Sequence, residues 1–122
     1  MKYLLLLNNA VEEWDAWRGL SPEDAQQAYQ QELPHWNALF GWMEEQGIDV
    51  KGLELDDPDK ARVVRVREGE TLVTDGPFAE TKEVLGGYFL ADCKDLDQAI
   101  ELAERVPLVD KGSVEIRPLV TH

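Results

Sequence analysis

One short stretch near the middle of the chain constrains the fold more than any other. It runs from Thr74 to Glu83, contains an Asp-Gly-Pro sequence that ends at Pro77, and is followed by the pair Gly86 and Gly87. Pro77 fixes φ and removes an N–H donor, and the glycine before it is biased towards extended geometry. The chain must therefore turn here between two apolar strands. Because a turn alone needs fewer special residues, we expect this segment to shape a site or to close one.

The residues around this stretch predict an alternation of strands and helices. Continuous or alternating apolar segments predict strands, and apolar residues at helical spacing after capping residues predict helices. Pro34 is expected to kink or restart the first long helix, because proline inside a helix removes a hydrogen bond. The expected strands are Tyr3–Leu7, Gly52–Leu55, Val63–Arg67, Thr71–Thr74, Gly87–Cys93 and Ser113–Arg117, and the expected helical segments begin at Ser21, His35 and Asp95.

The order of these elements is typical of an α+β protein with helices on one side of an antiparallel sheet. The split β-α-β arrangement of ferredoxin-like folds fits it best, as a single domain over residues 1–122. Two helices cover only one face of such a sheet, yet residues 4–7 and 88–91 place apolar side chains on both faces. This predicts a second layer on the other face, most simply the sheet of another copy.

The charge of the chain excludes some classes of partner. Its 25 acidic and 12 basic residues give a net charge of −13. Binding to nucleic acid or to an anionic membrane surface requires clustered Lys and Arg, so neither is expected. The acidity is expected to keep the protein soluble.

The few cysteine and histidine residues exclude other classes of site. Cys93 is the single cysteine and has no histidine near it in the sequence, so a buried, inert thiol is expected. With two histidines, one of them terminal, no metal site is expected, and no cofactor motif is present. The opening apolar run is too short for a signal peptide, and the lone cysteine fits a reducing compartment. A cytoplasmic location is therefore expected.

Residues Val73–Glu83 and Leu85–Tyr88 resemble the signature of DGPF-domain proteins in the YCII-related superfamily. The resemblance extends to Met1–Leu6, Asp95–Asp97 and Gly112–Pro118, and so covers most of the chain. It implies a ferredoxin-like subunit that forms a homodimer, a dimeric α/β barrel with sheet against sheet. Members of this mostly uncharacterised superfamily resemble small dimeric enzymes that act on aromatic breakdown products.

The resemblance also implies a catalytic pair of histidine and aspartate, for which His35 and Asp75 are the candidates by position. A partly desolvated carboxylate at a strand end can act as a general base, and a histidine can shuttle a proton near neutral pH. The alternatives are an Asx-type turn at Asp75 and a helix-start histidine satisfied by water or backbone at His35. Proximity of the two side chains would favour the pair.

Four further residues are candidates for substrate binding. Arg65 and Arg67 point to one face of their strand, where they could hold a carboxylate, or they could form a solvated face paired with acidic residues. Tyr88 could donate a phenolic proton in a cavity or pack in the core, and Phe78 of the motif is expected near the ligand.

Two functions remain open from the sequence. The first is a cofactor-independent enzyme that performs proton transfer, an isomerisation or an elimination, on a small organic acid. The second is a non-catalytic module that binds a small molecule or docks a partner. DGPF proteins resemble companions of alternative sigma factors in many bacteria, which supports this second interpretation.

Overall fold

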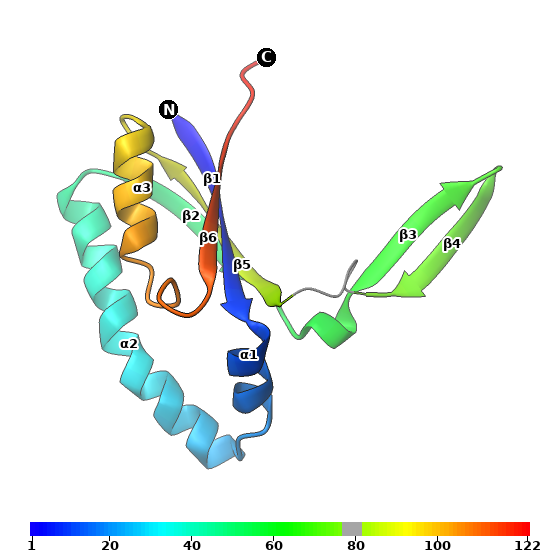
Figure 1. Cartoon of the computed structure of the whole chain (residues 1–122). Helices are drawn as coiled ribbons and strands as arrows, with labels where there is room; N and C mark the ends of the chain where they lie inside the picture. The colour runs from blue at the N-terminus through cyan, green and yellow to red at the C-terminus, as the bar shows by residue number, and fades with distance from the viewer. Residues whose placement is uncertain (77–81) are drawn as a thin grey trace.

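The computed structural model describes residues 1–76 and 82–122, and its centre is a four-stranded antiparallel sheet (Figure 1). The strand order β2-β5-β1-β6 is that of a ferredoxin-like fold, so the predicted α+β class is confirmed. The helices cover one face of this sheet. The strands are β1 (Lys2–Ala10), β2 (Asp49–Glu54), β5 (Glu83–Asp92) and β6 (Ser113–Pro118), and the helices are α1 (Val11–Arg18), α2 (Pro22–Glu45) and α3 (Leu96–Glu104).

The core lies between the sheet and the helices because strand residues alternate between the two faces. Tyr3, Leu5 and Leu7 of β1 are buried on the helix side. Leu39 and Met43 of α2 pack against this face. The rest of the buried apolar cluster comes from β5, from α3 and from the segments that flank them: Ile48, Phe89, Ala91, Cys93, Ala99, Leu102, Ala103 and Val106.

The other face of the sheet, called the open face here, also carries apolar side chains. Leu4 and Leu6 of β1 stand opposite Leu90 and Tyr88 of β5, and all four are half-buried. Leu53 of β2 extends the row beyond Tyr88 and is 69% exposed. A sheet apolar on both faces was expected from the sequence, and the structure has it. The second layer stays a prediction.

Most helix boundaries follow the capping residues in the sequence. The Ser21 hydroxyl accepts a hydrogen bond from the Asp24 N–H, and the Asp95 carboxylate accepts one from the Gln98 N–H. Gly47 follows α2 with a φ of 68°, which suits glycine. The predicted restart at Pro34 is wrong, because α2 continues through it as one helix of 24 residues. No helix of residues 1–76 and 82–122 is long and apolar enough to span a membrane.

The predicted strands Val63–Arg67 and Thr71–Thr74 form and pair as a hairpin, which lies outside the main sheet. Strands β3 (Arg62–Arg67) and β4 (Glu70–Asp75) pair only with each other, and this hairpin is called the β-arm below. Its turn has positive φ at Glu68 and Gly69, as two-residue hairpin loops require. Figure 1 shows the β-arm projecting from the body, beyond the short 3-10 helix Pro58–Lys60. The sequence predicted the two strands of the β-arm but not their separation from the main sheet.

Candidate functional site

A cavity of about 580 Å³ lies between α1, α2 and the helix side of the sheet. This volume is in the usual range for small-molecule sites. Aromatic side chains from three elements line it, and we call it the aromatic cavity. They are Trp14 and Trp17 of α1, Tyr29, Trp36 and Phe40 of α2, and Phe89 of β5.

The spacing of the aromatic residues along α2 explains why they meet at the cavity. Tyr29, Trp36 and Phe40 recur at helical spacing, so they share one face of the helix. Only Leu39 and Met43 of this helix are buried, and both belong to its C-terminal half. The N-terminal half therefore borders the cavity with its aromatic face instead of closing onto the sheet, and Figure 1 shows this part of α2 standing away from the strands.

Ring contacts hold one wall of the cavity in place. The ring of Phe89 meets Trp36 at a centroid distance of 6.4 Å and Phe40 at 6.2 Å, with interplanar angles of 75° and 74°. These are edge-to-face contacts, which aromatic rings favour over a face-to-face sandwich. The wall is therefore largely pre-formed before any ligand arrives.

Four glycines on the sheet side of the cavity keep side chains out of it. A Cβ at Gly52 would meet the Phe89 ring, and a Cβ at Gly86 would meet the Asn9 side chain. A Cβ at Gly87 would come within 2.9 Å of the Leu53 carbonyl oxygen, and one at Gly112 would overlap the Asn8 carbonyl. All four glycines line the aromatic cavity, so at these four positions its sheet side is formed by backbone.

The polar groups of the aromatic cavity are mostly carboxylates. Glu13, Glu32, Glu54 and Asp110 line it, together with Lys111, whose Nζ lies 3.4 Å from the Glu13 carboxylate. None of the described lining residues is a histidine, cysteine or serine, so no Ser–His or Cys–His pair forms among them. This arrangement is suited to holding a molecule.

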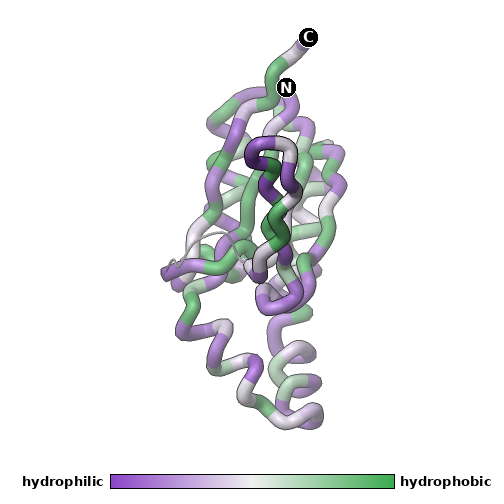
Figure 2. The backbone as a smooth tube through the Cα atoms, turned by 90° about the vertical axis from the view of Figure 1, so that its right-hand side faces the viewer, coloured by the Kyte–Doolittle hydropathy of each residue, from purple (hydrophilic) through white to green (hydrophobic). Residues whose placement is uncertain are grey.

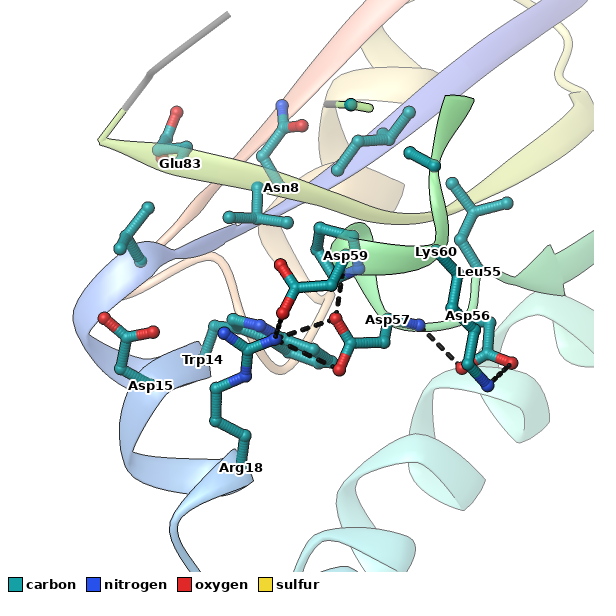
Figure 3. A pocket seen from close by; sticks show the side chains of 16 residues that line it. Asn8, Trp14, Asp15, Arg18, Leu55, Asp56, Asp57, Asp59, Lys60 and Glu83 are labelled. Carbon is teal, nitrogen blue, oxygen red and sulfur yellow. Dashed lines mark hydrogen bonds and ion pairs between the residues drawn. The ribbon is translucent and has the colours of Figure 1, made fainter. Parts of the chain in front are cut away.

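A second, larger cavity of about 1250 Å³ lies between α1, the segment around Pro58 and the adjoining ends of β1 and β5 (Figure 3). Five of its charged side chains pair with one another, Arg18 with Asp57 and Asp59, and Lys60 with Asp56. The guanidinium of Arg18 donates to the carboxylates of Asp57 at 2.8 Å and Asp59 at 2.7 Å, and it lies 5.6 Å from the Trp14 ring centroid. Trp14 thus lines both cavities.

These contacts shift the pKa values of several charged groups around the larger cavity. The N–H of Asp59 and the guanidinium of Arg18 both donate to Asp57 and hold the pKa of its carboxyl below the usual value. The same carboxylates raise the pKa of Arg18. Lys60, at 2.9 Å, lowers the pKa of the Asp56 carboxyl. These mutually paired charges link α1 to the loop that precedes the β-arm, and we call this cluster the clamp at Arg18.

The two catalytic candidates lie on different elements and line neither cavity. His35 is exposed on α2. Asp75 ends β4 with a side chain that is 88% exposed, and its carboxylate lies 3.4 Å from the Nε of Arg62. Within the described residues, no hydrogen bond or ion pair joins His35 to Asp75. The catalytic pair of His35 and Asp75 therefore stays a prediction, and the positions of the two side chains do not support it.

The substrate-binding candidates are also dispersed. Arg65 and Arg67 share a face of the β-arm, as expected, and Arg67 donates to the neighbouring Val66 carbonyl. Tyr88 of β5 is half-buried and is the one of the five described candidates that borders the aromatic cavity, while its side chain alternates to the open face. Phe78 lies outside the described residues.

The sequence did not reveal the α1 and α2 aromatics as a site. Of the four tryptophans, Trp42 packs on the core. Trp36 also packs on the core but lines the aromatic cavity as well, together with Trp14 and Trp17 of α1. A usable signal was the long aromatic stripe on a helix whose first half carries few aliphatic residues at core spacing.

Comparison with known proteins agrees with the resemblance found in the sequence. A family model described as the YCII-related domain matches residues 1–121. An uncharacterised protein of Rhizobium meliloti (strain 1021) is 47% identical over 64 residues, which make up 51% of this chain and 52% of that protein. The matched region thus spans about half the length of this curated relative.

Proposed function

The chain belongs to the YCII-related domain family, and from that premise we propose that it binds a small, largely apolar molecule in the aromatic cavity. The narrower likeness to DGPF-domain proteins rests on the motif around Asp75 and stays a prediction. The cytoplasmic location expected from the sequence stays a prediction.

The observation that carries the proposal is a set of apolar side chains that face the cavity without being covered. Tyr29 is 55% exposed and Phe40 is 45% exposed, although both lie on the sheet side of α2 and border an aromatic wall. Removing apolar surface from water contributes about 25 cal/mol per Å². A flat apolar molecule that binds between these rings would gain that stabilisation without a cost for ordering the wall, because the wall is already ordered.

The geometry supports binding more directly than catalysis. The proton-transfer enzyme expected from the sequence needs His35 or Asp75 beside the bound molecule, and neither lines the cavity. A small organic acid would also approach Glu32 and Glu54, whose negative charges oppose it. The isomerase or lyase therefore ranks second, and a regulatory role beside a sigma factor stays a prediction from the resemblance.

Titration with N-phenyl-1-naphthylamine, a neutral apolar fluorophore, tests the proposal. We expect enhanced, blue-shifted probe emission that saturates at one site per chain. The variant Tyr29→Ser is expected to weaken binding, because it removes one ring from the wall. The matched control Gln30→Ser changes the adjacent exposed residue of the same helix, which does not line the cavity. Absence of saturable binding, or equal loss in both variants, would contradict the proposal.

We also propose that two copies pack with their open faces together. The centre of this face is apolar and half-buried, with Leu4, Leu6, Tyr88 and Leu90 in adjacent pairs. Polar residues flank it, since Lys51 stands beside Leu90 and Arg117 beside Leu4. An apolar centre with a polar rim is the usual anatomy of a subunit interface. A two-fold axis would place each apolar row on its counterpart.

A further inference from the structure

The charge that borders the aromatic cavity is predominantly negative. Four carboxylates line the cavity against one ammonium group, and the described lining residues include no arginine or histidine. The carboxylates come from four separate segments, which are α1, α2, β2 and the loop before β6: Glu13, Glu32, Glu54 and Asp110. A molecule that binds here therefore lies in a negative field that several parts of the fold contribute to.

Only one of these carboxylates is paired within the described part of the chain. The Nζ of Lys111 lies 3.4 Å from the Glu13 carboxylate. In residues that the structure describes, the side chains of Glu32, Glu54 and Asp110 make no hydrogen bond or ion pair. Three carboxylates around the cavity are thus left to interact with the charge of a ligand.

The larger cavity has a similar set of groups, but there the chain itself supplies the cation. The guanidinium of Arg18 lies 5.6 Å from the Trp14 ring centroid and donates to the carboxylates of Asp57 and Asp59. A positive charge between an aromatic ring and carboxylates is therefore an arrangement that this fold already contains. In the aromatic cavity the rings and carboxylates are present, and the matching cation is left for a ligand to provide.

The rings of the aromatic cavity suit a cation as well as an apolar body, because the face of an aromatic ring attracts positive charge. Each helix places a carboxylate beside its rings. Trp17 lies four residues after Glu13 on α1, and Glu32 lies between Tyr29 and Trp36 on the cavity side of α2. At the lower end of the molecule, where α1 and the first turns of α2 lie, Figure 2 shows hydrophilic and hydrophobic residues interleaved along the helices.

From these observations we infer that the ligand of the aromatic cavity is a small organic ammonium ion with an aromatic body. The inference rests on the proposed binding function and adds the charge of the ligand. The body would lie against the wall of Trp36, Phe40 and Phe89, and the ammonium group would lie among the rings and carboxylates of α1 and α2. A quaternary ammonium group suits this site, since aromatic faces recognise it without directed hydrogen bonds.

Three ligands that share a naphthalene ring and differ in charge test this inference. They are the cation (1-naphthylmethyl)trimethylammonium, the neutral 1-naphthalenemethanol and the anion 1-naphthaleneacetate, each measured by its displacement of N-phenyl-1-naphthylamine from the full chain. We expect the cation to bind about tenfold more tightly than the alcohol, and the anion to bind more weakly than the alcohol. Added salt should reduce the preference for the cation, because exposed charges are screened.

The variant Glu32→Gln tests the contribution of one cavity carboxylate. It removes the charge and keeps the shape of the side chain, so it should weaken binding of the cation by about threefold and leave binding of the alcohol unchanged. The matched control Glu44→Gln removes the same charge from an exposed position of α2 that does not line the cavity. It should leave the affinity for both ligands unchanged.

The outcomes separate this inference from the proposed function. Equal affinities for the cation and the alcohol overturn the inferred charge and leave the apolar site intact. A cation that binds without displacing the fluorophore lies elsewhere on the acidic surface, which also overturns the inference. Equal loss of cation affinity in the two variants overturns the role of the cavity carboxylate. If neither the fluorophore nor any of the three ligands binds saturably, the inference and the proposed function both fail.

Discussion

At the scale of single residues, the glycines on the sheet side of the aromatic cavity show how backbone contacts limit the sequence. The resemblance pointed to Gly86 and Gly87 as part of a signature, and the structure gives the physical reason for their presence. A Cβ at Gly87 would meet the Leu53 backbone carbonyl, and a Cβ at Gly86 would displace the Asn9 side chain. The glycine pair could be recognised in the sequence. The neighbouring strands that contact it could not be predicted, because these contacts join residues far apart in the chain.

Gly112→Ala is expected to destabilise the fold. The new Cβ would overlap the carbonyl group of Asn8 in β1, and backbone atoms cannot move aside as a flexible side chain can. Overpacking of this kind costs about 1–3 kcal/mol. The control is Gly41→Ala on α2, where no atom lies within 4 Å of the new Cβ, and which should stabilise by about 0.5–1 kcal/mol. Urea denaturation measures both, and equal free energies of unfolding for the two variants would contradict this account.

The clamp at Arg18 should release in acid. The folded-state pKa of Asp57 is lowered, so its stabilising effect is present above the unfolded value of about 3.8 and is lost as the pH falls through the folded pKa. An NMR pH titration should show the Arg18 and Trp14 signals changing together below about pH 4. Asp57→Asn should abolish that step at Arg18, and a step that persists unchanged would show that Asp57 is not its source.

At the scale of elements, the sequence located nearly all helices and strands but misjudged α2. Pro34 predicted a kink or a restart, and the restart is wrong, because the helix is continuous from Pro22 to Glu45. Tertiary packing explains the difference, because buried Leu39 and Met43 anchor the second half and the aromatic stripe runs through the proline without a change of phase. Helix propensity is a weak preference that such packing can override.

Pro34→Ala is expected to raise the stability of the protein. It restores an N–H donor inside α2 and removes a ring that crowds the preceding turn, so the gain is up to about 3 kcal/mol. The midpoint of urea unfolding, with an unchanged denaturant slope, gives the measurement. A lower midpoint would instead mean that the local geometry at Pro34 is required by the fold.

At the scale of the whole molecule, the ferredoxin-like order was predictable because each strand and helix carries its own periodicity. The detachment of the β-arm was not, since the alternation in Val63–Arg67 is the same for a strand in any sheet. The site was also not predictable. His35 and Asp75 were chosen by their positions in the sequence. The cavity instead depends on the distance between α2 and the sheet, and the local sequence pattern carries no information about that distance.

Leu6→Glu tests the proposed packing of open faces. Leu6 lies in the middle of the face, between Tyr88 of β5 and Glu115 of β6, so a carboxylate there would be placed in the apolar centre of the interface. We expect the dimer to dissociate while the circular dichroism spectrum is retained. The control Leu96→Glu lies on an exposed position of α3 and should leave the dimer intact. Dissociation of the dimer by both variants, or by neither, would contradict the proposed packing of the open faces.

The ligand site in the aromatic cavity is the central claim, and fluorine NMR of the protein labelled with 5-fluorotryptophan tests it most directly. The chain has four tryptophans, of which Trp14, Trp17 and Trp36 line the cavity and Trp42 does not. Trp42 instead packs on the core with Arg105 over its ring, so it serves as an internal reference. During titration with a saturating apolar ligand, we predict that the three cavity signals shift and that the Trp42 signal stays in place. A ligand that binds while the three cavity signals remain unmoved would contradict the account.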